Sequence, residues 1–455
     1  MMNAELKTMT DWIQRDLRTL WHPFTQMKDC ETLPPVMIVK AEGLKLYDDQ
    51  GRAYDDTISS WWCNIHGHNH PTIRKAVMQQ LETLDHVLFA GFTHRPAIEL
   101  AERLVDITPE NLNRVFFSDN GSTAVEVALK MSLQYWRNGG HPEKCRFLSL
   151  DKAYHGDTVG AMSVSGRGLF TQAFTPMMFD PLEVPTPYAY RCPEASCSGK
   201  CNLRCIQSVE LLLSRRHQEI AAIILEPLLL AAGGMIVYPA DYLKKAAELA
   251  ERFDVHLILD EVATGFGRTG RMFACEHAGV TPDFMCLSKG LTSGTLPLAV
   301  TLTTEHIYEA FYDDYEAFKT FYHGHTYTAN PIGCAAALAT LDIFNQEHTL
   351  ERVRELVPYF HHRMQAFDTL PAVGDVRMIG LVGAVELVQD RAAKTPFELS
   401  RRVGLDIFTQ GLKEGLILRP LGNVVYLYLP LCVTRDDLES ILDRMYGIIQ
   451  RVTDG

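Results

Sequence analysis

Two hydrophobic segments of the sequence end in residues that can do chemistry. The segment LILDEVATGFGRTG passes from apolar residues into Asp260 and Glu261, and FMCLSKG passes into Lys289. Burial lowers the pKa of an ammonium group, and a neutral lysine amine is a nucleophile suited to Schiff-base chemistry. Taken singly, a solvated carboxylate and a lysine that reaches solvent from a strand end are the more common explanations.

Two further segments add an anion site and an aromatic ring. In FFSDNGSTAVEVALK, an apolar strand passes through Gly121 and Ser122 into a helix. Free N–H groups at a helix start bind anions, although a plain N-cap is the commoner role for serine there. Tyr154 follows the apolar segment RFLSL, and its ring could cover a planar ligand or be merely half-buried.

Together the four segments describe one site. A phosphate would bind at the helix N-terminus, a carboxylate would meet a ring nitrogen, an aromatic side chain would cover the ring, and Lys289 would form an imine. This combination is the protein side of pyridoxal phosphate chemistry.

The segment DEVATGFGRTG (260–270), followed by SKG (288–290), resembles the class III (subgroup II) aminotransferases of the fold-type I pyridoxal-phosphate superfamily, and the similarity covers nearly the whole chain. The resemblance implies that Lys289 is the Schiff-base lysine, and Asp260 the partner of the pyridine nitrogen. The other cofactor contacts that it implies are Gly121 and Ser122 at the phosphate, Tyr154 and Val262 on the two ring faces, Glu226 on the 3-hydroxyl side, and His325 and Thr326 at the phosphate of a neighbouring subunit. A homodimer with shared sites follows from the last two.

The segments LWHPFTQM, ISSWWCNIHGHNHP, THRPAIELAERL and LRPLGNVVYLYLP are similar to the branch of this family that serves biotin synthesis. That branch implies transamination of 8-amino-7-oxononanoate, with S-adenosylmethionine as the usual amino donor. The planar fork of Arg419 suits the substrate's carboxylate, with a surface ion pair as the alternative. The implied substrate contacts are Phe24, Trp61, Tyr154, Lys289, Gly324, Arg419 and Tyr426.

Phe24 departs from this pattern, because many members carry tyrosine there and some that use lysine as donor carry phenylalanine. Lysine therefore stays open as the donor. Another class III ω-amino-acid or diamine aminotransferase is the nearest alternative function. A nucleotide- or metal-binding protein is a more distant one, since GFGRTG is not a phosphate-binding P-loop motif.

Strands that are apolar on both faces alternate with helices, which predicts a buried, mainly parallel sheet. The expected fold is α/β: a large cofactor domain at 76–340, with residues 1–75 and 341–455 forming a small α+β domain. The predicted strands are 114–118, 146–150, 221–226, 255–261 and 283–288, with two short strands within 40–54. The predicted helices are 1–20, 71–84, 96–105, 122–136, 241–253 and 436–452.

The chain has 455 residues and a formal net charge of −13, which argues against a nucleic-acid partner because that role needs a basic face. Residues 1–20 carry charges throughout and lack the apolar core of a signal peptide. No stretch supplies the ~20 mostly apolar residues of a membrane-spanning helix. We therefore expect a soluble, cytoplasmic protein without a membrane partner.

Four cysteines, Cys192, Cys197, Cys201 and Cys205, cluster in an apparent insertion. They could hold structural zinc or an iron–sulfur cluster, or could simply be thiols in a loop. The histidines of HGHNH (66–70) suit zinc by type, but they fall in a motif that the family keeps without metal. We expect no metal at the reacting centre.

Overall fold

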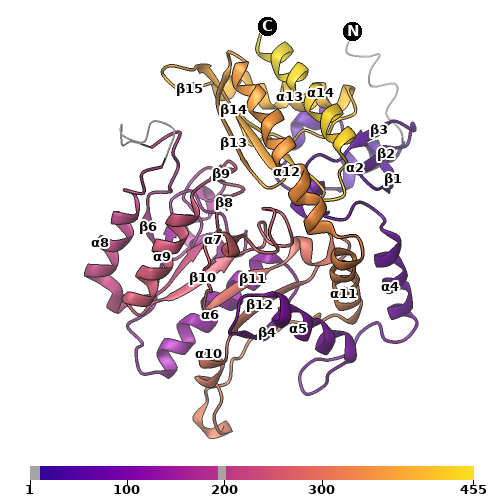
Figure 1. Ribbon diagram of the computed structural model, residues 1–455. Helices are drawn as coiled ribbons and strands as arrows, with labels where there is room; N and C mark the ends of the chain where they lie inside the picture. The colour runs from indigo at the N-terminus through magenta and orange to yellow at the C-terminus, as the bar shows by residue number, and fades with distance from the viewer. Residues whose placement is uncertain (1–10, 193–200, 455) are drawn as a thin grey trace.

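The computed structural model describes residues 11–192 and 201–454. Figure 1 shows a larger lower part, built around a seven-stranded sheet, and a smaller upper part in which N-terminal strands lie beside C-terminal helices. Helix α11 (Pro331–Gln346) runs across the expected boundary at residue 340, and the domain boundaries remain a prediction.

The large sheet is mainly parallel, as predicted. Its strand order is β4-β12-β11-β10-β7-β5-β6. The bounds are β4 (Leu112–Ser118), β5 (Arg146–Leu150), β6 (Leu182–Val184), β7 (Ile220–Leu225), β10 (His256–Asp260), β11 (Phe284–Leu287) and β12 (Ala299–Thr304). Only β12 among these strands runs antiparallel to its neighbours, so the other six have their carboxyl ends at one edge.

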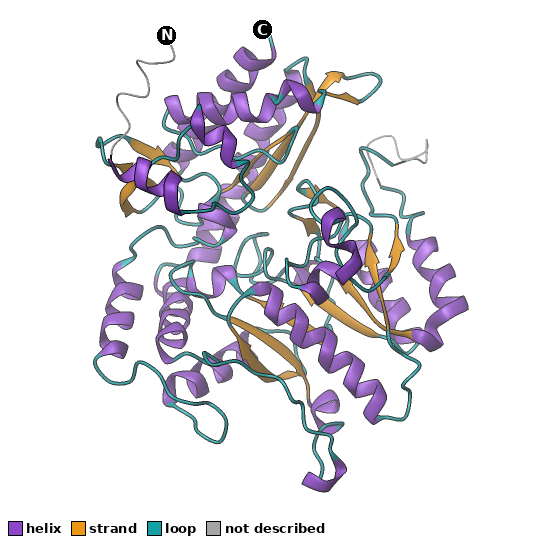
Figure 2. Cartoon of the chain, turned by 180° about the vertical axis from the view of Figure 1, so that it is seen from behind, coloured by secondary structure: helices purple, strands orange, loops and turns teal. Residues whose placement is uncertain are grey.

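Helices cover both faces of this sheet (Figures 1 and 2). In β10, Ile258 packs in one core cluster with Val125 of α6 (Gly121–Asn138), while Leu257 and Leu259 pack in another with Leu243 of α9 (Ala240–Arg252). Burial on both faces explains why these strands are continuously apolar in the sequence.

The upper part contains two small antiparallel sheets. One consists of β13 (Val373–Ile379), β14 (Val382–Asp390), β15 (Thr395–Pro396) and β16 (Val424–Tyr428), and the other of β1 (Ile38–Glu42), β2 (Lys45–Asp48) and β3 (Ala53–Asp55). The two strands predicted within 40–54 correspond to β2 and β3, and β1 was missed because the chain also turns back at Gly43, where φ is +55°. Asp55 joins the N- and C-terminal segments by backbone hydrogen bonds to Gly415 and Ile417.

The predicted helices are present with small shifts of their ends. They are α4 (Pro71–Leu81), α5 (Arg95–Ile107), α6, α9 and α14 (Arg435–Thr453), while α2 (Asp11–Thr19) is the described part of the one expected over 1–20. The other helices are α3 (Ser59–Trp62), α7 (Val159–Ser163), α8 (Ile206–Arg216), α10 (Glu305–Glu309), α12 (Thr349–Gln365) and α13 (Val403–Lys413), and β8 (Leu229–Leu230) pairs with β9 (Ile236–Val237).

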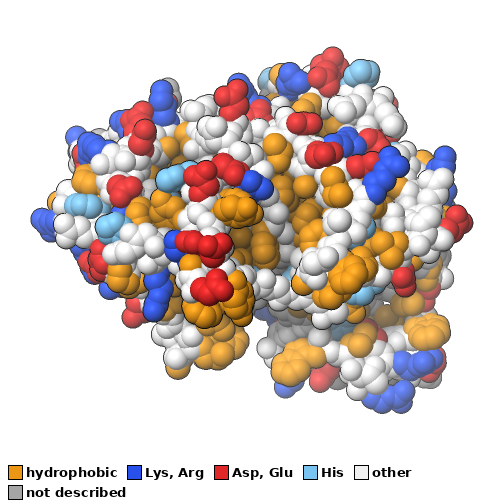
Figure 3. Space-filling model, turned by 90° about the horizontal axis from the view of Figure 1, so that it is seen from below, with side chains coloured by type: hydrophobic (Ala, Val, Ile, Leu, Met, Phe, Trp, Pro, Cys, Tyr) orange, Lys and Arg blue, Asp and Glu red, His pale blue; other side chains and the backbone are white. Residues whose placement is uncertain are grey.

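The lower face of the molecule is hollowed, and hydrophobic side chains gather in and around the hollow (Figure 3). Across the described ranges, the chain forms no helix long and apolar enough to cross a bilayer.

Candidate active site

A cavity of about 1220 Å³ opens at the carboxyl edge of the large sheet. Five parallel strands deliver predicted site residues to it, which is where α/β sheets bind ligands. Gly121 follows β4, Tyr154 follows β5, Glu226 follows β7, Asp260 ends β10 and Lys289 follows β11. The other predicted residues that line the cavity are Phe24, Trp61, Ser122, Val262, Arg419 and Tyr426.

Lys289 projects into this cavity from a left-handed backbone conformation, with φ at +46°. Burial lowers the pKa of its ammonium group, and the carboxylates of Asp260 and Glu226 oppose that shift. The ring centroid of Trp62 lies 4.7 Å from Nζ. A desolvated amine facing a cavity is a nucleophile and a proton carrier.

Asp260 is buried and held from both sides. Its Oδ2 lies 2.8 Å from Nδ1 of His155, and its Oδ1 accepts the backbone N–H of Val262 at 3.1 Å. The other ring nitrogen of His155, Nε2, is buried without a partner among the described residues. The carboxyl group is thereby fixed in orientation, and it lines the cavity.

Glu226 fixes the backbone beside the cavity. Its Oε1 accepts the N–H of Tyr154 at 2.9 Å, and its Oε2 accepts the N–H of Ala231 at 3.0 Å. Burial raises the pKa of Glu226 to about 7. These bonds set where the Tyr154 ring stands, because its backbone is held at the end of β5.

The start of α6 forms a cradle for an anion. Asn120 caps the helix by accepting the N–H of Thr123 at 3.1 Å, so Ser122 is not the cap. The Ser122 hydroxyl instead accepts the N–H of Asp157 at 3.2 Å. A Cβ on Gly121 would lie 2.6 Å from the Val262 side chain, so only glycine allows this close approach. Unpaired N–H groups and the positive helix end favour a phosphate here.

Aromatic side chains and Arg419 form the part of the cavity away from the sheet. The Arg419 guanidinium stacks 4.4 Å from the Trp61 ring, and Phe24 contacts Trp61 edge-on at 5.8 Å. Within the described ranges, no carboxylate forms an ion pair with Arg419. A guanidinium has a planar fork that can bind a carboxylate through two parallel hydrogen bonds.

Gly324, His325 and Thr326 do not line the cavity of their own chain. They follow the segment after α10 that projects at the bottom of Figure 1. Both ring nitrogens of His325 are buried without a partner among the described residues.

Sequence reasoning missed several residues at the site, among them His155 and Trp62. His155 stands beside Asp260, and Trp62 stands beside Lys289 and donates its indole N–H to the Tyr426 hydroxyl at 3.1 Å. Both lie inside segments singled out above, next to the assigned Tyr154 and Trp61. Their roles became evident only from contacts with residues far away in the sequence, Asp260 and Lys289.

The histidines of HGHNH hold separate parts of the fold. His66 bonds the Thr340 carbonyl at 3.1 Å, His68 bonds Asp56 at 2.8 Å and His70 bonds Glu347 at 3.0 Å. Over 11–192 and 201–454, no three His, Cys, Asp or Glu side chains are grouped to hold a metal ion.

Of the four clustered cysteines, Cys197 lies outside the described residues. Burial and the neighbouring Cys201 and Cys192 raise the pKa of Cys205 to about 12. The choice between a metal site and a loop of thiols at this insertion stays open.

The sheet, the buried lysine at a strand end and the anion cradle together define a class of protein. The family description "Aminotransferase class-III" matches residues 26–449, and the chain belongs to this family. The predicted fold-type I architecture and the assignment as an aminotransferase are thus confirmed.

Individual proteins that are similar to this chain indicate which branch of the family it resembles. Adenosylmethionine-8-amino-7-oxononanoate aminotransferase of Geobacter sulfurreducens is 45% identical over 100% of both chains. The crystal structure of the protein with the same name from Methanocaldococcus jannaschii has a TM-score of 0.92 at 39% identity, covering 97% of this chain and 98% of that one. An omega transaminase from Pseudomonas jessenii, solved in complex with PMP, has a TM-score of 0.93 at 33% identity over 98% and 99% of the two chains.

Proposed function

We propose that the cavity holds pyridoxal phosphate. Gly121 and Ser122 at the start of α6 line the cavity, Asp260 presents a carboxyl group fixed in orientation, and Lys289 presents a desolvated amine. When bound, the cofactor supplies a carbonyl for the amino group and a ring that acts as an electron sink. Tyr154 and Val262 would cover its two faces, and Glu226 would lie on its 3-hydroxyl side.

The chain's own groups divide the work of transamination. Lys289 Nζ would hold the cofactor's carbonyl carbon, and its amine, once free, would take the proton from the donor's amine-bearing carbon and return it to the cofactor. Asp260 would lie at the ring nitrogen, and its carboxyl group would favour the protonated form of the ring. The same groups act in reverse on the keto acceptor, which gives a ping-pong reaction.

We propose 8-amino-7-oxononanoate as the acceptor, converted to 7,8-diaminononanoate for biotin synthesis. The observation that carries this is Arg419, stacked on Trp61 in a large cavity and without a carboxylate partner among the described residues. A substrate with a carboxylate at the end of a long alkyl chain would place its keto group at Lys289 and its anion at Arg419. The names of the similar proteins support the same acceptor.

We propose S-adenosylmethionine as the amino donor. Phe24, Trp61 and Phe170 form an exposed aromatic group, with centroid distances of 5.8 and 5.7 Å. Aromatic faces attract a sulfonium cation and stack on a flat base. Lysine remains the alternative donor.

Purified protein with pyridoxal phosphate and 8-amino-7-oxononanoate is expected to form diaminononanoate when S-adenosylmethionine is added. Product is quantified by mass spectrometry, with lysine in a parallel reaction. Product with lysine alone would reverse the assignment of the donor. Turnover of simple amines without turnover of this acceptor would favour an ω-amino-acid or diamine aminotransferase.

Arg419→Ala is expected to raise KM for the keto acid about 100-fold, because a hydrogen-bonded ion pair to the carboxylate is lost. The control substrate is the same keto compound as its methyl ester, whose KM should change little. Arg419→Lys keeps the charge without the planar fork, so its KM for the keto acid should lie between those of the wild type and Arg419→Ala. An equal loss on acid and ester would place the carboxylate elsewhere.

We propose a homodimer in which Thr326 and the His325 backbone reach the partner's phosphate site, with Gly324 near its substrate. Tyr312, Tyr315, Phe318, Tyr322 and Tyr327 are all more than half exposed in this region. Exposed aromatic residues in such number favour a protein interface, and hydrophobic side chains also gather on the lower face (Figure 3). We further propose that the enzyme works in the cytoplasm, where biosynthetic relatives would share its substrates.

A further inference from the structure

The short segment Ser59–Trp62 carries unusual backbone strain beside the reacting lysine. Ser59, Ser60 and Trp62 have φ values of +52°, +58° and +70°. None of the three is glycine, and other L-residues rarely adopt positive φ. Strain of this kind persists only where the surrounding structure enforces it, and it concentrates at functional sites.

The strain serves to present two consecutive tryptophans to one cavity. Trp61 stacks on Arg419, and Trp62 stands 4.7 Å from Nζ of Lys289 and bonds to the Tyr426 hydroxyl. Trp62 is almost fully buried, whereas Trp61 is 38% exposed. The backbone of this segment therefore sets both the substrate wall and the surroundings of the reacting amine.

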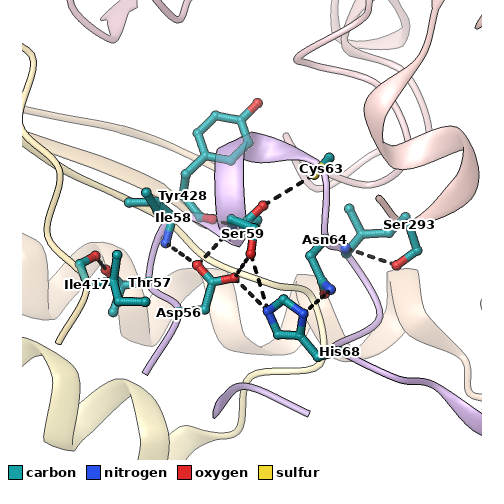
Figure 4. A network of polar contacts seen from close by, with 12 residues as sticks. Asp56, Thr57, Ile58, Ser59, Cys63, Asn64, His68, Ser293, Ile417 and Tyr428 are labelled. Carbon is teal, nitrogen blue, oxygen red and sulfur yellow. Dashed lines mark hydrogen bonds and ion pairs between the residues drawn. The ribbon is translucent and has the colours of Figure 1, made fainter. Parts of the chain in front are cut away.

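Asp56 holds the strained backbone in place (Figure 4). Its carboxylate is completely buried. Oδ1 accepts the backbone N–H of Ser60 at 2.8 Å and that of Ile58 at 3.3 Å. Oδ2 accepts the Ser60 hydroxyl at 2.8 Å and lies 2.8 Å from Nε2 of His68.

His68 in turn fixes the Asp56 carboxylate. The Asn64 side-chain amide donates to Nδ1 of His68 at 3.1 Å, so Nε2 carries the hydrogen that points at Asp56. The backbone of His68 pairs with Gly43 in both directions, at 2.7 and 3.1 Å, in the turn between β1 and β2. The contacts of Asp56 and His68 are therefore anchored to a sheet outside the cavity. The Ser59 hydroxyl also donates a hydrogen bond to the Tyr428 carbonyl at 2.6 Å.

We propose that Asp56 and His68 are positioning residues of the active site. They hold Ser59–Trp62 in its strained conformation and thereby place Trp61 against Arg419 and Trp62 against Lys289. Neither side chain lines the cavity. The inference rests on the proposed function only in taking this cavity as the substrate site.

The test compares Asp56→Asn with a matched control, Asp48→Asn, in the holoenzyme. Asp48 is also buried and accepts two backbone N–H groups, from Gln50 and Arg52, but it lies in the β2–β3 turn and does not line the cavity. Asp56→Asn is expected to raise the acceptor's KM about 10- to 100-fold, because displaced positioning groups lose productive alignment. It should also increase acrylamide quenching of tryptophan fluorescence, while Asp48→Asn changes neither.

A second substitution distinguishes a loss of positioning in Asp56→Asn from a general loss of fold stability. Glycine adopts positive φ readily, so Ser60→Gly in the Asp56→Asn protein should recover part of the KM and the quenching. If Asp56→Asn does not fold, His68→Gln keeps the Ser60 bonds and should give smaller shifts in the same direction. Unchanged KM and quenching in either variant, or no rescue by glycine, would overturn the proposal. A wild-type protein without turnover would refute the proposed function instead, and the quenching comparison would still decide the role of Asp56.

Discussion

Replacing Lys289 with alanine is expected to reduce kcat about 10⁴-fold or more, because one change removes both the nucleophile and the proton carrier. No other lysine lines the cavity in the described part of the chain, so none is placed to take over. The measurement is single-turnover formation of diaminononanoate with S-adenosylmethionine and excess pyridoxal phosphate. The alanine protein should still bind the cofactor, because the cradle at Gly121 and the Asp260 carboxylate are unchanged.

Two variants control for this result. Lys289→Arg keeps a cation at the site but supplies no nucleophilic amine at neutral pH, so it should be equally inactive. Lys144→Ala removes another buried lysine, which bonds to Asp254 outside the cavity, and should keep near-normal kcat at a temperature where it is folded. Turnover by Lys289→Ala within about tenfold of wild type would refute the role assigned to this lysine.

Asp260→Asn is expected to reduce kcat about 10²- to 10³-fold, the range seen when one preorganised electrostatic contact is lost. The amide has nearly the same shape, but it carries no charge to hold a proton on a ring nitrogen. Its KM for the acceptor should stay within about threefold, because Asp260 lies at the sheet and the carboxylate contact is at Arg419.

His155→Ala is expected to reduce kcat less than Asp260→Asn does. It removes the 2.8 Å contact to Asp260 but leaves the charge, so kcat should fall only about tenfold, as expected for one lost hydrogen bond to a charged group. The double variant should be little worse than Asp260→Asn alone, since both act through one contact. Additive losses, or an active Asp260→Asn enzyme, would show that the carboxylate does not act on a bound ring.

The sheet and its site could be predicted because the relevant signals are local. Strands β7 and β10 are apolar on both faces. Asp260 and Lys289 stand at the ends of apolar segments of the sequence. Parallel pairing then brings such strand ends to one edge without further information. Arg419 and Trp61 have no such pattern, and the resemblance to a known family supplied them.

The contacts that escaped prediction join residues far apart in the chain. His155 meets Asp260 because β5 and β10 flank β7, an order that the sequence does not state. The left-handed backbone at Ser59 and Ser60 was hidden because neither residue is glycine, the usual signal for positive φ. Such strain can be recognised only once the buried Asp56 that stabilises it is seen in place.

The most direct measurement is to locate the covalent bond to the cofactor. The protein is incubated with pyridoxal phosphate, reduced with borohydride and digested, and the modified peptide is identified by mass spectrometry. We predict one modified residue, Lys289, with modification lost in Lys289→Ala and retained in Lys144→Ala. Modification of another lysine with Lys289 unlabelled, in a preparation that turns over the keto acid, would contradict the account.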